Sequence, residues 1–189
     1  PVGFVADISS EKETNKLIEK FKKEKINFDI IVYNAGSSTV VKDSLASRED
    51  FQKVWNLNLG AAVALNKFAV PYMKKKKWGR IVLGGSIGTK FGGGSNNLAY
   101  SLSKFNNEFF PSYYKKLYPL NIIVNTLQIG VSKTKLHKKL KSKNMKKRIK
   151  LIPLKRMANP DEIANYIYYL CSEKNSLLTG SIINASGGE

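Results

Sequence analysis

Apolar and polar positions along the chain change their spacing repeatedly. Apolar runs bounded by turn residues predict strands at residues 28–33, 80–84, 121–127 and 180–184. Longer stretches with apolar residues at helical spacing predict helices at residues 10–24, 47–75, 97–117, 133–150 and 160–172. Strands that alternate with helices in this way indicate an α/β fold with a parallel sheet. The sequence has no internal repeat or linker, so we expect one domain over residues 1–189.

Two short segments mark the ends of elements. Gly3 to Ala6 has the pattern of the end of a strand. Ser47 is followed three residues later by Asp50, which resembles a capping box and predicts that a helix starts there.

Composition restricts the class of protein. A hydrophobic content of 42% over 189 residues is enough for a folded core. The sequence contains no run of about 18 uncharged apolar residues, so no membrane span is predicted. We also expect no secretory leader, because the first residues lack its basic-then-apolar pattern. The single cysteine, Cys171, excludes an internal disulfide and suits a reducing compartment. We therefore expect a cytoplasmic protein without a membrane segment.

The net charge of +18 allows two interpretations. Lysines spread over solvated helix faces would explain it without any partner, whereas an acidic partner or anionic substrate would be attracted by it. The basic runs contain few aromatic residues for base stacking, so no nucleic-acid partner is expected. One histidine, His137, and one cysteine offer little for a metal, and no metal site is predicted.

Candidate polar and glycine residues follow the predicted strands. Asp7, the segment 34–36, Ser86 and Gly130 each follow one. In open α/β sheets, ligands bind beyond the carboxyl ends of the strands. We therefore expect these residues to belong to one site.

Tyr100 and Lys104 are the strongest candidates for chemistry. Residues four apart lie on the same face of a helix, and an ammonium group there is expected to lower the pKa of the tyrosine. Such a tyrosine can act as a general acid or base. Spacing alone also fits a solvated helix face.

Ser86 and Asn58 add polar groups near this pair. Ser86 lies in a glycine-rich turn, where it could hydrogen-bond a substrate oxygen or simply form the turn. Asn58 falls within a predicted helix, where asparagine has low propensity. A local kink or a bound water would explain it, and so would an ordinary exposed or buried asparagine.

Together these segments resemble the short-chain dehydrogenase/reductase family, nearest in type to the 3-oxoacyl-(acyl-carrier-protein) reductases. The likeness extends over essentially the whole chain, with the segments in the family's order. The matching positions are Ala6–Ile8, Asn34–Gly36, Asn58–Leu59, Ser86, Tyr100, Lys104, Val124–Asn125, Gly130, Thr134, Leu178–Gly180 and Gly187–Gly188.

The resemblance implies a catalytic tetrad. Tyr100 would be the general acid/base, and Lys104 would lower its pKa and hold the nicotinamide ribose. Ser86 would orient the substrate carbonyl, and Asn58 would hold a water behind Lys104 in a proton relay.

The resemblance also implies an NAD or NADP cofactor. Asp7 and Ile8 would meet the adenine ring. The turn at Asn34, Ala35 and Gly36 would pass near the adenine ribose. Gly130, Ser132 and Thr134 would contact the nicotinamide end, together with Tyr100 and Lys104.

The chain departs from the family pattern in three places. It begins near the end of what would be the third strand, so we expect a three-layer, Rossmann-like, doubly wound parallel sheet that lacks the first βαβ segment. That segment carries the phosphate-binding turn and the residue that distinguishes NAD from NADP. Ile129 replaces the usual proline before Gly130, and Lys135 replaces an acidic residue. The gap from Ser86 to Tyr100 is one residue longer than is commonest, and the run Gly92–Gly94 could absorb it.

Expected partners follow from the resemblance. The substrate would be a small carbonyl or alcohol compound, free or linked to a carrier protein or CoA, covered by a basic lid at 133–150 with Leu136, Leu140 and Met145 facing it. A lid without charge preference fits equally. The family forms homodimers and homotetramers, and Phe105, Phe109 and Phe110 would lie either between subunits or in the core.

Three functions were weighed against these patterns. The first is an NAD(P)-dependent oxidoreductase acting on a carbonyl or secondary alcohol. The alternative is a catalytically silent homologue that acts as a binding or scaffold protein. A sugar-nucleotide epimerase would need a larger C-terminal substrate region than the sequence contains.

Overall fold

The computed structural model describes residues 2–37, 47–93, 97–134 and 142–189. Within them, parallel strands form one sheet of order β1-β2-β3-β4. Their bounds are β1 (Ile30–Tyr33), β2 (Gly79–Ser86), β3 (Ile122–Ile129) and β4 (Ile182–Ala185). The register places Ser86 opposite Ile129 and Ile129 opposite Ala185, so the carboxyl ends of β2, β3 and β4 meet at one edge. The predicted α/β parallel fold is confirmed.

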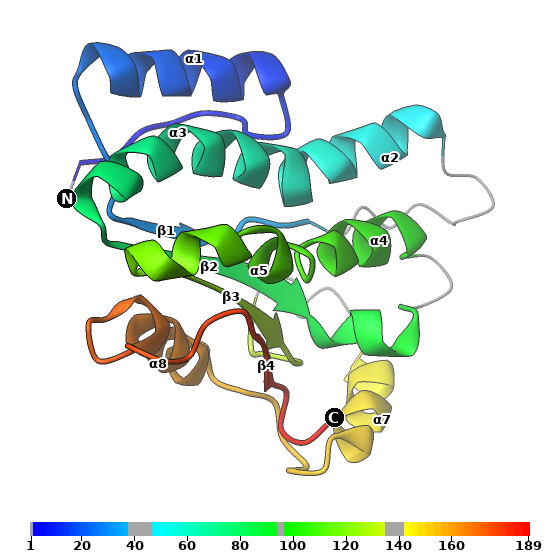
Figure 1. Ribbon diagram of the computed structural model, residues 1–189. Helices are drawn as coiled ribbons and strands as arrows, with labels where there is room; N and C mark the ends of the chain where they lie inside the picture. Colours follow the sequence, from blue (N-terminus) through cyan, green and yellow to red (C-terminus); the bar gives the residue numbers. More distant parts are fainter. Residues whose placement is uncertain (1, 38–46, 94–96, 135–141) are drawn as a thin grey trace.

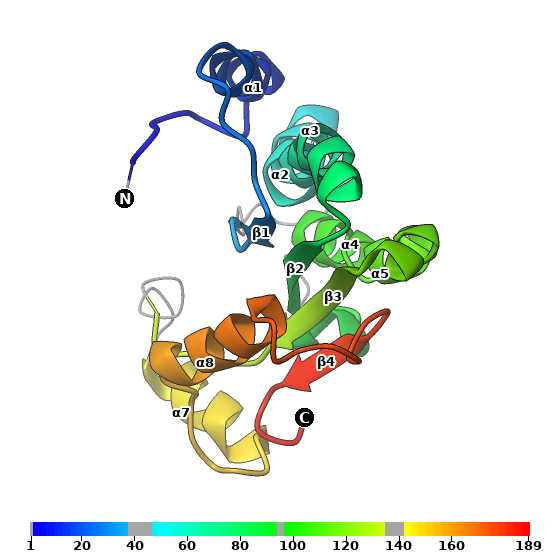
Figure 2. The ribbon, with the colours of Figure 1, turned by 60° about the vertical axis from the view of Figure 1, so that its left-hand side comes forward.

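Helices cover both faces of this sheet. Helices α3, α4 and α5 pack on one face and α8 packs on the other, while α1 lies outside α3 (Figures 1 and 2). The result is a layered arrangement with the sheet in the middle. The helix bounds are α1 (Glu11–Lys23), α2 (Arg48–Trp55), α3 (Ala61–Lys76), α4 (Leu98–Asn106), α5 (Phe110–Tyr113), α7 (Ser142–Leu151) and α8 (Pro160–Cys171).

Alternation along the central strands divides the core in two. Ile81 and Leu83 of β2 pack with the helices of the α3 face. Val82, between them, packs with Ile163 of α8 on the other face. Because successive side chains of a strand point to opposite faces, a continuously apolar strand is what a sheet covered on both faces requires.

Serine side chains cap the first turns of α1 and α2. Ser10 caps α1 by accepting a hydrogen bond from the backbone N–H of Glu13 at 3.3 Å. At α2, Ser47 Oγ accepts from the N–H of Asp50 at 3.1 Å, and Asp50 accepts from the N–H of Ser47 at 2.9 Å. The predicted capping box is therefore confirmed. It satisfies two N–H groups that the helix leaves without partners.

The predicted helix at 97–117 is interrupted in the structure. Helix α4 ends at Asn106, and α5 begins at Phe110 with Pro111 in its first turn. Proline lacks an N–H and cannot continue a preceding helix, and the 3₁₀ segment η4 (Lys115–Leu120) follows. The sequence analysis did not predict this break between α4 and α5.

Other predicted elements changed their extent. Gly3 to Ala6 forms no strand, and within the described residues no strand pairs with it. Val2 and Val5 are 83% and 105% exposed, as an unpaired segment would be. The helix expected at 133–150 is present at 142–151, and residues 135–141, including Leu136 and the position of Lys135, lie outside the described residues. Leu140 and the lid contact predicted for it lie there as well.

Two features of the described residues bear on function. None of the helices described here is both long and apolar enough to cross a membrane. Within the same residues, no group of three or more histidine, cysteine or acidic side chains is placed to hold a metal ion.

Arg80 of β2 ties the amino ends of the strands to the end of α8. It is 2% exposed. Its guanidinium donates to the carbonyl oxygens of Asn121 at 3.0 Å, Ser172 at 3.3 Å and Asn175 at 3.1 Å. It also stacks on Trp78, 4.5 Å from the ring centroid. A buried cation is tolerated here because carbonyl dipoles replace its hydration.

We expect Arg80→Met to lower the free energy of unfolding by about 3 kcal/mol, because it leaves buried carbonyl oxygens without donors. Urea denaturation measures this directly. The matched control is Arg48→Met at the exposed start of α2, which should stay within about 0.5 kcal/mol of the parent protein. Equal effects of the two substitutions would refute the role given to Arg80.

Candidate active site

A cavity of about 1510 Å³ opens at the carboxyl ends of the strands. Ser86 is the last residue of β2, and the segments after β1 and β3 lie beside it. Tyr100 and Lys104 reach the cavity from α4. The predicted site residues that line it are Asn34, Gly36, Ser86, Tyr100, Lys104, Gly130, Ser132 and Thr134.

Lys104 is buried at the floor of this cavity and is 4% exposed. Its Nζ donates to the carbonyl oxygen of Gly84 at 2.8 Å and to that of Ala35 at 3.1 Å. These carbonyls belong to β2 and to the turn after β1. Burial lowers the pKa of Lys104 to about 8, because the low-dielectric surroundings disfavour the charged form.

The turn after β1 leaves room for Lys104 only because Gly36 has no side chain. A Cβ at Gly36 would lie 2.9 Å from Lys104 Nζ and 3.1 Å from Asn58 Oδ1. Both distances are shorter than ordinary contact. Gly36 therefore lets the lysine and the asparagine approach the same point of the backbone.

Tyr100 lies beside Ser86 at the cavity wall, and its titration differs from the expectation. Burial raises the pKa of Tyr100, and a hydrogen bond with Ser86 lowers it by less. The ammonium group of Lys104 points to the carbonyl oxygens of Ala35 and Gly84. The lowering of the Tyr100 pKa by Lys104 stays a prediction.

Ser86 is held by the turn that follows β2. Its Oγ accepts a hydrogen bond from the backbone N–H of Gly88 at 3.2 Å. A hydroxyl group has one hydrogen and can accept as well, so Ser86 keeps its hydrogen for another acceptor. Tyr100 and the cavity lie on that side.

Asn58 lies behind Lys104 in a π-helical segment, η2 (Asn56–Gly60), between α2 and α3. It is fully buried. Its side-chain amide donates to Ser103 Oγ at 2.8 Å, and Oδ1 accepts from the N–H of Ser37 at 3.1 Å. The helix is thus locally irregular at this position, and π-helical turns occur often at functional sites. Its role in a water relay stays a prediction.

Gly130 follows β3, where two chain segments come very close. A Cβ at Gly130 would lie 2.6 Å from Ser186 Cα, so no larger residue fits without moving the backbone. Ser132, two residues on, is buried and donates to the carbonyl oxygen of Gly130 at 3.1 Å. Ile129, which replaces the proline of the family pattern, pairs in the sheet on both sides.

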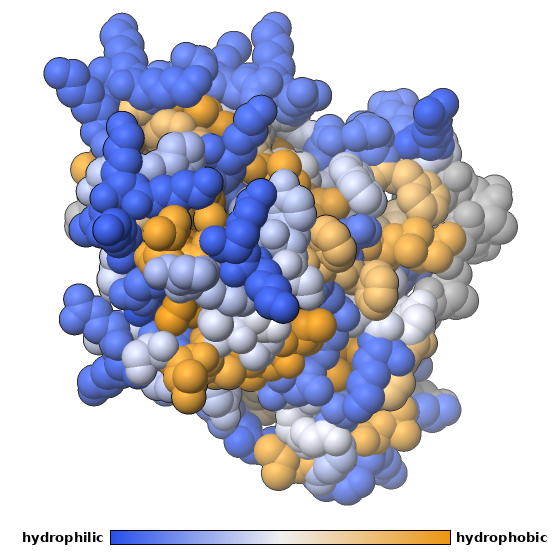
Figure 3. Space-filling view, viewed as in Figure 1, coloured by the Kyte–Doolittle hydropathy of each residue, from blue (hydrophilic) through white to orange (hydrophobic). Residues whose placement is uncertain are grey.

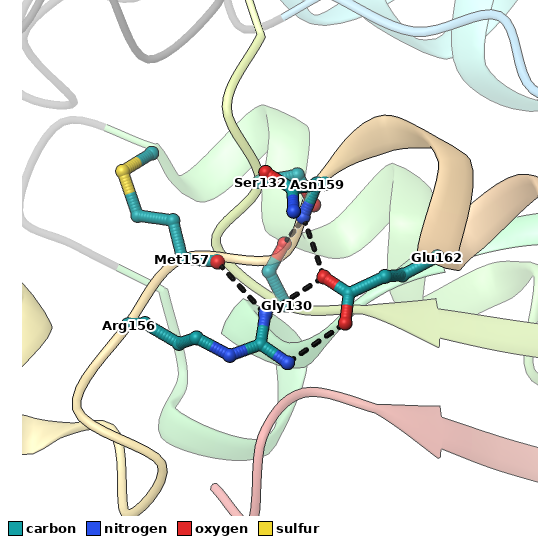
Figure 4. Close-up of polar contacts among 6 residues, drawn as sticks. All are labelled: Gly130, Ser132, Arg156, Met157, Asn159 and Glu162. Carbon is teal, nitrogen blue, oxygen red and sulfur yellow. Dashed lines mark hydrogen bonds and ion pairs between the residues drawn. The ribbon is translucent and has the colours of Figure 1, made fainter.

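The segment after β3 is held by the residues that precede α8, and Figure 4 shows the polar contacts within each of these two segments. The N–H of Ala158 donates to the carbonyl oxygen of Val131 at 2.9 Å. Arg156 makes two ion-pair contacts of 2.7 Å with Glu162, whose carboxylate also caps the N–H of Asn159 at 2.8 Å. The arginine holds the pKa of Glu162 down at about 2.

Four predicted residues, Asn58 among them, do not line the cavity. Asp7 is exposed and accepts from both the N–H and the hydroxyl of Ser9, which lowers the pKa of Asp7. Ile8 packs against the core of the α3 face. Ala35 contributes its carbonyl oxygen to Lys104. The adenine contacts expected for Asp7 and Ile8 stay predictions.

The sequence reading missed several residues around the site. Arg148 of α7 and Glu189 both line the cavity and form an ion pair. Gln128 and Glu108 lie beneath the turn that follows Ser86. The sequence could have pointed to Gln128, because this polar residue lies between the apolar residues Leu127 and Ile129 of a strand.

Comparison with known proteins gives consistent matches. A family model described as enoyl-(acyl carrier protein) reductase matches residues 1–189. The 3-oxoacyl-(acyl-carrier-protein) reductase FabG of Buchnera aphidicola subsp. Schizaphis graminum is 34% identical over 193 residues, covering 98% of this chain and 76% of the relative. The enzyme of the same name from Aquifex aeolicus is 33% identical over 190 residues, covering 98% and 75%.

A solved structure agrees with the sequence matches. The 3-oxoacyl (acyl-carrier-protein) reductase of Agrobacterium tumefaciens, with NADP bound, has a TM-score of 0.85 and 26% identity over 97% of this chain and 72% of its own. The expected family is confirmed by these matches. The chain belongs to the short-chain dehydrogenase/reductase family of NAD(P)-dependent oxidoreductases, near its 3-oxoacyl-(acyl-carrier-protein) reductases.

Proposed function

We propose that this chain moves a hydride between NAD(P)(H) and a carbonyl or secondary-alcohol substrate, with Tyr100 as general acid/base. The observation that carries the proposal is that Ser86, Tyr100 and Lys104, from β2 and α4, line one cavity. When bound, the nicotinamide supplies or accepts the hydride, and the protein has to place the substrate and handle its proton.

The residues at the floor of the cavity fit the nicotinamide end of such a cofactor. An ammonium group has three hydrogens, and carbonyl oxygens of the described residues accept two of those of Lys104. The remaining hydrogen suits a ribose hydroxyl. Gly36 and Gly130 keep the walls bare where side chains would narrow the space. We assign the adenine end to Asp7 and Ile8 and the intervening turn to Asn34.

Proton transfer follows from the state of Tyr100. Because burial raises its pKa, Tyr100 carries its proton at neutral pH and can donate it to a substrate oxygen during reduction. Ser86 donates a hydrogen bond to the same oxygen and aligns it. Asn58, behind Lys104, holds the water that returns a proton to Tyr100.

The substrate that we propose is a 3-oxoacyl group on an acyl-carrier protein. The names of the similar enzymes support it. The rim of the cavity adds a physical reason, since Arg148 and Leu151 of α7 line it and Lys146, Lys147 and Lys150 beside them are exposed. An acidic carrier would be attracted to this basic helix.

A homodimer is part of the proposal. Phe105 and Phe109, near the end of α4, are 58% and 65% exposed, whereas Phe110 is 7% exposed and belongs to the core. Figure 3 shows apolar surface on the face that carries α4 and α5, interrupted by hydrophilic side chains. We place a contact between subunits at Phe105 and Phe109.

We expect Tyr100→Phe to lower kcat for reduction of a 3-oxoacyl thioester about a thousandfold, because the substitution removes the proton donor. The loss of NADPH absorbance measures the rate. Tyr118→Phe is the matched control. Its hydroxyl donates to Pro111 at the other end of the sheet, and its kcat should match that of the parent protein.

Two results would contradict this assignment. If Tyr100→Phe turned over as fast as the parent protein, Tyr100 would not be the proton donor. If the parent protein oxidised neither NADPH nor NADH with any 3-oxoacyl thioester, we would conclude that it is a catalytically silent homologue that acts as a binding or scaffold protein.

Lys104 makes cofactor binding depend on pH. With a pKa of about 8, the group is charged below this pH and neutral above it, and a neutral amine is a weaker donor. Fluorescence titration should show NADPH binding weaker by about fivefold at pH 9 than at pH 7. Lys104→Met should remove the difference, whereas Lys90→Met, at an exposed lysine, should keep it. A parent protein with equal affinity at both pH values would exclude this role.

A further inference from the structure

A cluster of three polar side chains lies beneath the turn that follows Ser86. Thr89 comes from the 3₁₀ segment η3 (Ile87–Phe91), Glu108 from the turn between α4 and α5, and Gln128 from β3. Glu108 Oε1 accepts from Thr89 Oγ1 at 2.6 Å and from Gln128 Nε2 at 2.6 Å. Gln128 Nε2 also donates to Thr89 Oγ1 at 3.1 Å. Each side chain therefore contacts the other two.

This cluster exists because β2 has no side chain at Gly85. Gly85 lies opposite Gln128 in the sheet. A Cβ at Gly85 would lie 3.0 Å from Thr126 Cγ2 and 3.4 Å from Gln128 Cγ. The two side chains of β3 occupy that space and reach the turn after α4, where Thr126 donates to the carbonyl oxygen of Asn107 at 2.6 Å.

Thr89 connects the cluster to Ser86. Its Oγ1 lies 2.8 Å from the carbonyl oxygen of Ser86 and 2.6 Å from Glu108 Oε1. The hydroxyl shares its one hydrogen between these two acceptors. The side-chain amide of Gln128 donates to both Thr89 Oγ1 and Glu108 Oε1. The backbone of Ser86 is thereby held from below, opposite the cavity.

The hydrogen bonds to Glu108 are the strongest in the cluster, because its carboxylate is charged. Hydrogen bonds to a carboxylate are shorter and stronger than those between neutral groups, and a half-buried carboxylate without them would be costly. Glu108, Thr89 and Gln128 are all absent from the cavity lining. They can affect the reaction only through the residues that they hold.

We infer that Glu108 is a positioning residue for the proposed reaction: through Thr89 it fixes the turn that presents Ser86 to the substrate oxygen. The inference rests on the proposed function for its catalytic part. Its structural part concerns the turn at 86–93 and needs no cofactor. The two parts can therefore be tested separately.

Hydrogen–deuterium exchange tests the structural part. The N–H of Gly93 donates to the carbonyl oxygen of Gly88 at 2.8 Å, so order in the turn slows exchange there. In Glu108→Leu, peptides covering 86–93 should exchange about tenfold faster, while peptides of β4 should not change. Glu108→Gln, which keeps the carbonyl oxygen as acceptor, should stay within about twofold of the parent protein.

Two further variants separate positioning from general destabilisation. Thr89→Val removes the connecting hydroxyl with little change of shape and should speed exchange at 86–93 as Glu108→Leu does. Thr179→Val is the control: it removes the acceptor of the Val124 N–H at 3.2 Å, away from the turn after α4, and should leave 86–93 unchanged. The inference is overturned if Thr179→Val speeds this segment as much as Glu108→Leu, or if Glu108→Leu and Thr89→Val leave it unchanged. Faster exchange in every peptide of Glu108→Leu, with a normal Thr89→Val, would overturn it too.

Kinetics test the catalytic part. With NADPH and a 3-oxoacyl thioester, Glu108→Leu should lower kcat on the order of tenfold, since a small displacement of a positioning group has effects of this size. The KM for NADPH should change by less than about twofold, because Ser86 acts on the substrate oxygen. Glu108→Gln should restore kcat. A KM effect without a kcat effect would contradict the inference. No turnover by the parent protein would refute the proposed function, and the exchange data would still decide the role of Glu108.

Discussion

The candidate site depends on one interaction, the pair of hydrogen bonds from the ammonium group of Lys104 to the carbonyl oxygens of Ala35 and Gly84. It joins α4 to the ends of β1 and β2. Buried backbone carbonyl groups are costly without a donor, and the lysine supplies one to each of these two, with Asn107 as a second donor to Gly84. Helix α4 is thereby placed so that Tyr100 lies beside Ser86.

Small residues and buried amides make this arrangement possible. Gly36 admits Lys104 and Asn58 to the same point, and Gly85 gives Thr126 and Gln128 access to the turn after α4. Asn107, which is fully buried, donates to the carbonyl oxygen of Gly84 at 3.3 Å. On the α4 side, the end of the sheet nearest the cavity is therefore held by polar contacts, whereas on the α8 side the apolar core reaches the cavity at Ile163. Polar contacts fix direction as well as distance, and a proton donor needs both.

Much of this was predictable from sequence, because strand and helix patterns report burial directly. The order of elements, the parallel sheet and the cap at Ser47 followed from local patterns. Eight of the predicted site residues meet at the cavity because the carboxyl ends of parallel strands do so. Pro111 signals the break after α4, which apolar spacing alone does not reveal. The direction of the Tyr100 pKa was not predictable, because it depends on how deeply the fold buries the hydroxyl, which spacing along one helix does not determine.

Isotope transfer tests the central claim most directly. The protein is incubated with NADPH that carries deuterium at the transferable C4 position, together with a 3-oxoacyl thioester, and the product is examined by mass spectrometry. The account predicts a 3-hydroxyacyl product with one deuterium bound to C3. A product with no deuterium at C3, or no product with either nicotinamide cofactor, would contradict it.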